Sequence, residues 1–355
     1  MPRTQGTLIA YTSAAAIVVM AAWILWDAAD TAGSKAFIST PQFLLWLLLL
    51  CAQAVVWVLG FFVAGAIVRG RFRALHAAGA LSARLAAQMV TAAVVLFALA
   101  AIFASSLGHQ IGIPKEIGTS GLGSQTSPLT HHGLKLSPVV VVGVLVGLLA
   151  IGGMWLVSLA FERIATKPPL RAGSIDLFVG LRNELNTLLA IAAAIVGLGA
   201  LATGALRAAV LAANDEPFYR DRAVTCLTSY VDAPSAKRRE QVLRNFDDLA
   251  KTHPSCIELV FARKYVFEYT LFFTGLLAIA YAPSSLAMRR AGVRLRNKAY
   301  PMLAPGNAKF FDRLEQRRRL DEFLQTNLLA NANFKAGVAL LTPLAGSLVS
   351  LLLPT

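Results

Sequence analysis

Seven long runs of apolar residues divide this sequence, and they restrict the fold more than any other feature does. A helix needs about 20 mostly apolar residues to cross the hydrocarbon core of a bilayer. Each run reaches or approaches that length, and charged residues collect between the runs rather than inside them. The sequence therefore predicts an all-α, polytopic membrane protein with about seven transmembrane helices. The runs cover approximately residues 8–27, 42–68, 85–107, 138–161, 185–213, 265–287 and 334–353.

The composition agrees with a membrane protein and bears on its partners. Mean hydropathy is +0.61 and only 15% of the residues are charged, whereas an ordinary soluble domain is roughly 25% charged. The net charge of +14 would raise nucleic-acid binding in a soluble protein. Here no zinc-finger spacing or aromatic-basic motif accompanies the charge. We therefore expect no nucleic-acid partner, and assign the basic residues to cytoplasmic loops and anionic headgroups.

The first run has two interpretations. It ends in Trp23 and Trp26, residues typical of a membrane interface, and only Arg3 precedes it. A cleaved signal peptide is the alternative, but the run is long and no strong small-residue cleavage site follows it. The sequence favours a retained membrane anchor.

The distribution of Lys and Arg predicts the orientation. If the N-terminus is cytoplasmic, the cytoplasmic side holds 20 Lys and Arg and the outer side 3, with the fifth connection left out. Such an asymmetry is the ordinary positive-inside signature. Together with Ala-, Arg- and Leu-rich composition, it predicts a multi-pass protein of a bacterial inner (plasma) membrane with a cytoplasmic N-terminus.

These signals define the expected organisation of the chain. We expect transmembrane helices 1–5 in residues 1–213, transmembrane helix 6 at 265–287 and transmembrane helix 7 at 334–355. Two polar parts lie between them. Residues 214–264 are predicted to form a helical loop subdomain on the extracytoplasmic side, and residues 288–333 a basic cytoplasmic segment with an amphipathic helix.

The predicted outer loop contains the stretch "KRREQVLRNFDDLAKT". Its basic residues would favour the cytoplasmic side, whereas the order of the spans places the loop outside. The positive-inside rule is weak for long loops, and this one is nearly balanced in charge. Its apolar residues recur at helical spacing, which predicts an amphipathic helix; they are Val242, Leu243, Phe246 and Leu249. Cys226 and Cys256 flank that helix, and an oxidising compartment would permit a disulfide between them. The alternative is two unrelated small hydrophobic residues in a cytoplasmic loop.

The basic segment contains a second amphipathic stretch, 310–329, with three consecutive arginines, Arg317, Arg318 and Arg319. A helix of this kind lies on the inner leaflet with its basic face among anionic lipids. We therefore expect lipid contacts at these arginines. A docking site for a cytoplasmic protein is the alternative.

Few features inside the runs suggest chemistry. Arg207 and Glu268, at the outer ends of neighbouring runs, are a candidate intramembrane ion pair. Gly143 and Gly147 form a GxxxG pattern that favours close helix packing, within one bundle or in a homo-oligomer.

No catalytic, phosphate-binding or metal-binding signature is recognisable, and the paired His131 and His132 stand without other ligands at metal spacing. We therefore expect no cofactor and no metal, and an enzyme is the less favoured class. The sequence favours a non-enzymatic scaffold, sensor or accessory subunit that binds protein partners through 214–264 or 288–333. A channel or transporter is the alternative, and a lipid-modifying enzyme has the least support.

Overall fold

The computed structural model describes five long helices and several shorter ones. The described residues are 3–26, 37–79, 132–166, 172–212, 223–231, 235–253 and 263–324, with the single positions 91, 95, 98 and 256. Within this described part there is no strand, so the prediction of an all-α chain is confirmed there. The predicted spans at 85–107, apart from those three positions, and at 334–353 lie outside the described residues.

Five of the described helices are long and apolar enough to cross a membrane. They have the character expected of a multi-pass membrane protein. These helices are α1 (Arg3–Leu25), α3 (Pro41–Ala77), α6 (His132–Thr166), α7 (Ala172–Ala212) and α12 (Arg263–Ala299).

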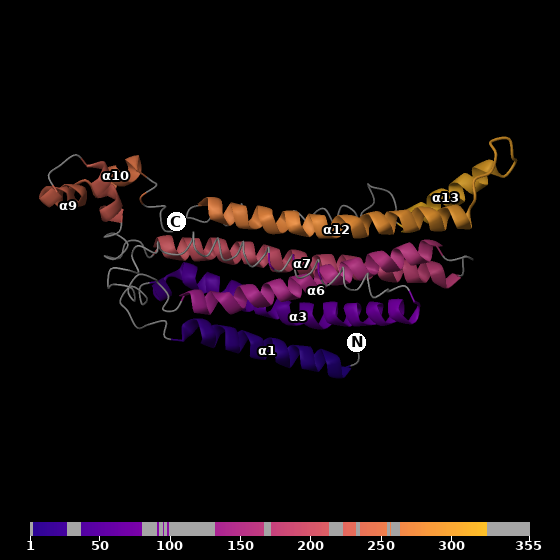
Figure 1. Cartoon of the computed structure of the whole chain (residues 1–355), viewed down its shortest axis with the longest axis horizontal. Helices are drawn as coiled ribbons and strands as arrows, with labels where there is room; N and C mark the ends of the chain where they lie inside the picture. Colours follow the sequence, from indigo (N-terminus) through magenta and orange to yellow (C-terminus); the bar gives the residue numbers. More distant parts are fainter. Residues whose placement is uncertain are drawn as a thin grey trace.

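The five helices run side by side, with α7 at the centre (Figure 1). Helix α7 contacts α3, α6 and α12, whereas α1 packs on α3 at the edge. In the most apolar window of each helix, 61% of the residues of α7 are buried but only 6% of those of α1. Most of the α1 surface is therefore exposed, and α7 forms the core.

Helix direction places the two polar segments at opposite ends of the bundle (Figure 1). Helices α3, α6 and α12 run one way, whereas α1 and α7 run the other. The short helices η2 (Thr228–Tyr230), α9 (Ser235–Arg244) and α10 (Phe246–Thr252) lie beyond one end, here named the disulfide end. Helix α13 (Phe310–Leu324) lies at the other, here named the basic end. The N-terminus is also at the basic end.

All five long helices extend beyond their apolar runs, and α3, α7 and α12 extend furthest, all three at the basic end. Helix α3 continues to Ala77, α7 begins at Ala172 and α12 continues to Ala299. Residues 69–77, 172–184 and 288–299, which lie between the predicted runs, therefore continue the long helices. A helix of 37 residues is roughly 55 Å long, well beyond the ~30 Å hydrocarbon core.

Local signals set both ends of α3. Thr40 accepts a hydrogen bond from the Phe43 backbone N–H through its hydroxyl oxygen (3.2 Å), and Pro41 occupies the first turn. At the other end Gly79 has a φ of 62° and donates its N–H to the His76 carbonyl (2.9 Å). Glycine adopts this left-handed conformation at little cost, which ends the helix.

Glycines set how closely the central helices approach. A Cβ added at Gly60 would lie 2.7 Å from Val146 Cγ1 and 2.9 Å from Ile191 Cγ2. Gly60 therefore allows α3 to contact α6 and α7 at one point. At Gly143, a Cβ would come within 3.4 Å of Trp57 Nε1. The first glycine of the predicted GxxxG pattern thus packs within the bundle, against α3.

We expect Gly60→Ala to lower the stability of the bundle. Val146 and Ile191 are β-branched and have little rotamer freedom, so the added methyl group should force α3 outward. Overpacking of this kind costs about 1–3 kcal/mol. Thermal unfolding of the purified protein in detergent checks this. The matched control is Gly65→Ala on the same helix, where the nearest side-chain atom would be at 3.8 Å. Equal melting temperatures for the two variants would contradict the packing argument.

Candidate functional site

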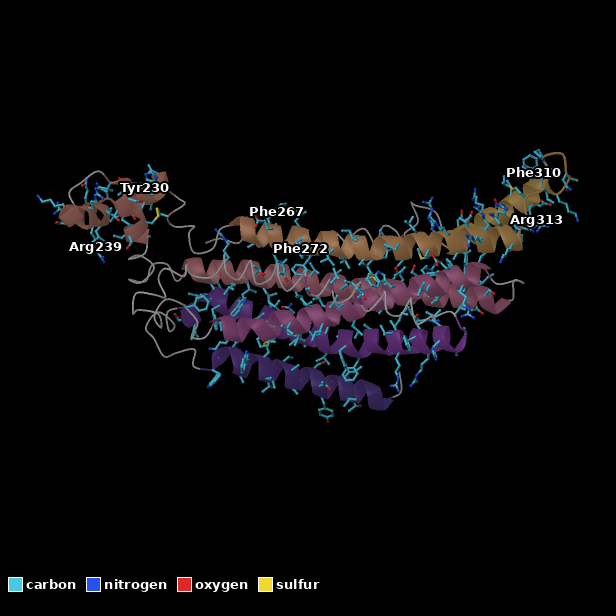
Figure 2. The ribbon with its side chains drawn as sticks, in the orientation of Figure 1. Tyr230, Arg239, Phe267, Phe272, Phe310 and Arg313 are labelled. Carbon is cyan, nitrogen blue, oxygen red and sulfur yellow. A yellow bond between two sulfur atoms is a disulfide. The ribbon has the colours of Figure 1, made fainter. Side chains whose placement is uncertain are left out.

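A disulfide joins Cys226 to Cys256 at the disulfide end, with a Cα–Cα distance of 5.5 Å and a sequence separation of 30. The bond is visible beside α10, and Tyr230 and Arg239 are labelled in the same segment (Figure 2). Closing a loop of this length contributes about 3–4 kcal/mol in the chain-entropy model. We refer to the described residues of 223–256 as the disulfide segment.

The disulfide segment has a small core of its own. Val224, Leu227, Val231 and Val242 are buried with Cys256, and Cys226, Phe246 and Leu249 pack against them. Tyr230 stacks on His253 with ring centroids 4.2 Å apart. Short helices that bury one face on a shared cluster in this way need no other element to cover that face.

The predicted single helix over "KRREQVLRNFDDLAKT" is two helices in the structure. Helix α9 ends at Arg244 and α10 begins at Phe246, with Asn245 between them. Of the four predicted apolar positions, Val242 is fully buried, and Phe246 and Leu249 are half-buried against the same core. Leu243 is 45% exposed, so it is not covered by the core of the disulfide segment.

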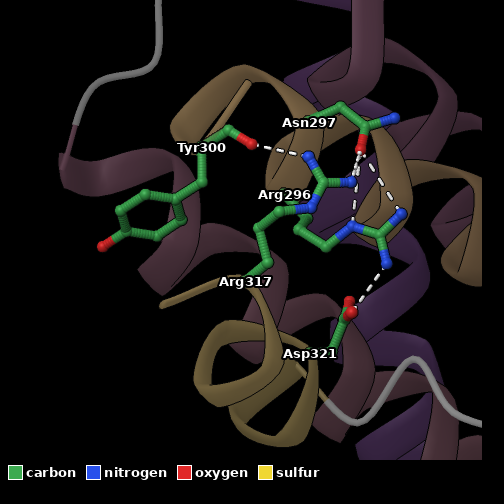
Figure 3. A network of polar contacts seen from close by, with 5 residues as sticks. All are labelled: Arg296, Asn297, Tyr300, Arg317 and Asp321. Atoms are coloured by element: carbon green, nitrogen blue, oxygen red, sulfur yellow. Dashed lines mark hydrogen bonds and ion pairs between the residues drawn. The ribbon is translucent and has the colours of Figure 1, made fainter. Parts of the chain in front are cut away.

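Helices α12 and α13 are joined at the basic end by a network of polar contacts (Figure 3). Arg296 Nη1 donates to Asp321 Oδ2 at 2.6 Å, and these side chains are only 24% and 12% exposed. Arg317 Nη1 donates to the Tyr300 carbonyl at 2.6 Å, and Arg317 Nη2 donates to Asn297 Oδ1 at 2.7 Å. Hydrogen bonds to charged groups contribute about 1.5–3 kcal/mol each, so the network fixes α13 against the end of α12.

The three consecutive arginines of α13 differ in environment. Arg317 faces α12, and burial together with the like charge of Arg296 lowers the pKa of its guanidinium, an effect that Asp321 opposes. Arg318 and Arg319 are exposed and lie beside Glu315 of the same helix, at 3.8 and 3.1 Å. The hydrogen bonds of Arg317 are therefore made within the protein. Lipid contact stays a prediction for Arg318 and Arg319.

Further arginines connect other helices at the basic end. Arg71 of α3 makes a two-bond ion pair with Glu184 of α7, at 2.6 and 2.5 Å. Arg163 of α6 donates to the Ala78 carbonyl at the end of α3. Arg182 of α7 donates to the Phe323 carbonyl near the end of α13 at 3.2 Å. Carbonyls at helix ends lack intrahelical donors, and cations are favoured there.

At the disulfide end, Lys135 makes a comparable contact with carbonyls at a helix end. This side chain is buried at the start of α6, and its Nζ donates to the Ile24 carbonyl at 3.1 Å and to the Trp26 carbonyl. Trp23 Nε1 returns a hydrogen bond to the Lys135 carbonyl at 3.2 Å. The end of α1 is thus tied to α6. Nothing in the sequence indicated this role, because Lys135 is there only one of the Lys and Arg residues predicted on the outer side.

The structure does not bring Arg207 and Glu268 together. Arg207 is buried on α7, whereas Glu268 is exposed on α12. Val266 and Thr270, two residues to either side of Glu268, are buried. Since residues two apart lie on roughly opposite faces of a helix, Glu268 faces away from the bundle, and the described residues hold no ion pair between the two.

Possible metal ligands, including the paired histidines, are the last sequence feature to place. Among the described residues, no group of three or more His, Cys, Asp or Glu could hold a metal ion. The side chains of His131 and His132 lie outside the described part.

Compared with known protein families, curated proteins and solved structures, the chain matches none of them. Function must therefore be argued from the two polar segments and the helices that hold them.

We expect Arg317→Ala to release α13 from α12. The substitution removes both contacts of this guanidinium, to Tyr300 and to Asn297, so the amides of residues 310–324 should exchange faster, with a loss of protection of about 1 kcal/mol or more. Hydrogen–deuterium exchange in detergent or nanodiscs measures this. Arg318→Ala is the matched control, because its exposed pairs within the helix contribute little. If both variants exchange alike, the network does not hold α13.

Proposed function

We propose that this chain is a non-enzymatic membrane scaffold or accessory subunit that presents a protein-binding segment on each side of the bilayer. The observation that carries the proposal is the exposure of apolar side chains on both polar segments, which lie at opposite ends of one bundle. Leu243 of the disulfide segment is 45% exposed, and Phe311 and Phe323 of α13 are 77% and 58% exposed. Large side chains of this kind are the ones that act as anchors when a protein partner covers them.

Helix α12 supports this function because it connects the two segments. It begins at Arg263, seven residues after Cys256, and ends at Ala299, next to the network that fixes α13. A partner bound at one segment is thereby linked to the other through one continuous helix. A sensor or an accessory subunit of a larger complex requires a connection of this kind.

The membrane orientation is part of the proposal. We place the protein in a bacterial plasma membrane, with the basic end in the cytoplasm and the disulfide end outside. Arginines at the ends of α3, α6, α7 and α12 favour the cytoplasmic side for the basic end, and a disulfide is expected where thiols are not kept reduced.

The orientation predicts how the cysteines react. In a Cys51→Ser background, a membrane-impermeant maleimide should label Cys226 and Cys256 of intact cells only after reduction, because the disulfide protects both thiols until then. Labelling is read by peptide mass spectrometry. As a control, Gln316→Cys in a background without the native cysteines puts an exposed thiol on α13, which should react only in broken cells. Labelling of Cys226 in broken cells alone would reverse the proposed orientation.

The scaffold function predicts a stoichiometric protein partner. Purification from native membranes in mild detergent should retain it with the wild-type chain, and quantitative mass spectrometry should show its loss from Phe311→Ser/Phe323→Ser or from Leu243→Ser. Removal of a large apolar anchor from an interface commonly costs about 2 kcal/mol or more. Gln316→Ser and Gln241→Ser are controls at exposed polar positions on the same helices. A chain that purifies alone, or a partner retained by all variants, would contradict this assignment of the surfaces.

A further inference from the structure

Helices α3, α6, α7 and α12 enclose a cavity of about 190 Å³ inside the bundle. It is partly open rather than sealed, and its walls are mostly apolar. Glycines on α6 and α7 help to create the space: a Cβ added at Gly147, which lines the cavity, would meet no atom within 4 Å. The second glycine of the predicted GxxxG pattern thus borders an open space and does not contact a helix.

The cavity is long and narrow. Along α6 its lining runs from Val139 to Ile151, a rise of roughly 18 Å along the helix axis. A compact cavity of roughly 150 Å³ is enough for a molecule of the size of benzene. A similar volume drawn out along the helix axes fits a single hydrocarbon chain better than a compact ligand.

The polar groups of the cavity gather towards the disulfide end. The lining continues towards the disulfide end as far as Trp46 on α3 and Leu206 on α7. Gln53 lies one helical turn before Trp57, which is beside Gly143, so Gln53 is level with Val139, in the half of the cavity nearer the disulfide end. Tyr269 lines the same end from α12, and its hydroxyl would lie 2.7 Å from a Cβ on Gly199. The far end is bordered by apolar residues such as Ile151 and Leu277.

Gln53 is the feature that points to a ligand. Its side chain is buried, at 6% exposure, and makes no hydrogen bond within the described part of the chain. A buried amide without a partner costs about 1–3 kcal/mol. Thr203, which also lines the cavity, already donates its hydroxyl to the Gly199 carbonyl at 2.7 Å. A ligand with a hydrogen-bonding group at this level would satisfy Gln53.

None of the described residues that line the cavity carries a charge. A charged headgroup inside it would be costly, whereas an ester carbonyl can accept a hydrogen bond from the Gln53 amide or the Tyr269 hydroxyl. Phospholipids surround these helices and combine an ester carbonyl with a narrow apolar chain. We propose that the cavity binds one acyl chain of a phospholipid from the leaflet at the disulfide end, with its ester carbonyl at Gln53 and Tyr269 and its headgroup outside.

The test uses the full chain in nanodiscs that contain a phospholipid with a photoreactive diazirine in one acyl chain. After irradiation, peptide mass spectrometry should locate cross-links on the cavity-lining parts of α6 and α7. Gly147→Leu should fill the cavity and lower these cross-links about tenfold. Gly152→Leu is the matched control: it lies on the same helix, is not part of the lining, and its Cβ also meets no atom within 4 Å.

A second variant covers the case in which Gly147→Leu fails to fold. Gln53→Leu keeps the apolar walls but removes the polar partner, so native mass spectrometry should show less phospholipid retained than with the wild type. The proposal is overturned if Gly147→Leu and Gly152→Leu cross-link equally, or if Gln53→Leu retains as much lipid as the wild type. It is also overturned if a diazirine-bearing fatty alcohol labels the lining and the phospholipid does not, because the occupant would then be a free single-chain amphiphile.

Discussion

The unpaired carbonyls at helix ends are the constraint on which much of this structure depends. A backbone in hydrocarbon must satisfy its hydrogen bonds internally, which forces it into helices, but a helix leaves its last carbonyls without donors. In the described part of the chain, a cationic side chain from another helix donates to such carbonyls at four helix ends. The contacts are Lys135 to α1, Arg163 to α3, Arg317 to α12 and Arg182 to α13. Each satisfies an acceptor, neutralises the negative end of a helix dipole and holds that helix end against a neighbouring helix.

This double use of cations explains what the sequence could predict and what it could not. Counting Lys and Arg places the basic residues at one end of the bundle, because the count needs only helix order. The count cannot show that Arg317 has a different environment from Arg318 and Arg319, because all three are arginines in one continuous run. Successive residues are about 100° apart on a helix, so the packing of α13 on α12 decides which arginine is engaged. The helix ends were missed for a related reason: hydropathy marks the limits of the hydrocarbon core, whereas α3 and α12 continue as helices beyond it.

The sequence also did not predict the roles of single polar residues in apolar surroundings. Lys135 and Gln53 have no partner that can be recognised from nearby sequence, because Lys135 bonds to residues 109 and 111 positions away and Gln53 lines a cavity formed by four helices. By contrast, the small core around Cys226 and Cys256 is formed by residues that are close in sequence. Cysteine spacing and helical periodicity could therefore indicate several of its members. Whether residues 214–264 form an independent subdomain stays a prediction.

Helix α12 shows how packing preserves an element that local propensity would weaken. Pro283 cannot donate a hydrogen bond to the Ile279 carbonyl, and a proline inside a helix costs about 3 kcal/mol, yet α12 continues unbroken to Ala299. The next residue, Ser284, is buried and donates its hydroxyl to the Met154 carbonyl of α6 at 2.9 Å. Leu277, Tyr281 and Met288 are buried in the core shared with α6 and α7. Packing on one face thus holds the helix together where the proline, exposed on the other face, removes a backbone bond. The connection from the disulfide segment to α13 therefore depends on how α12 packs against α6 and α7.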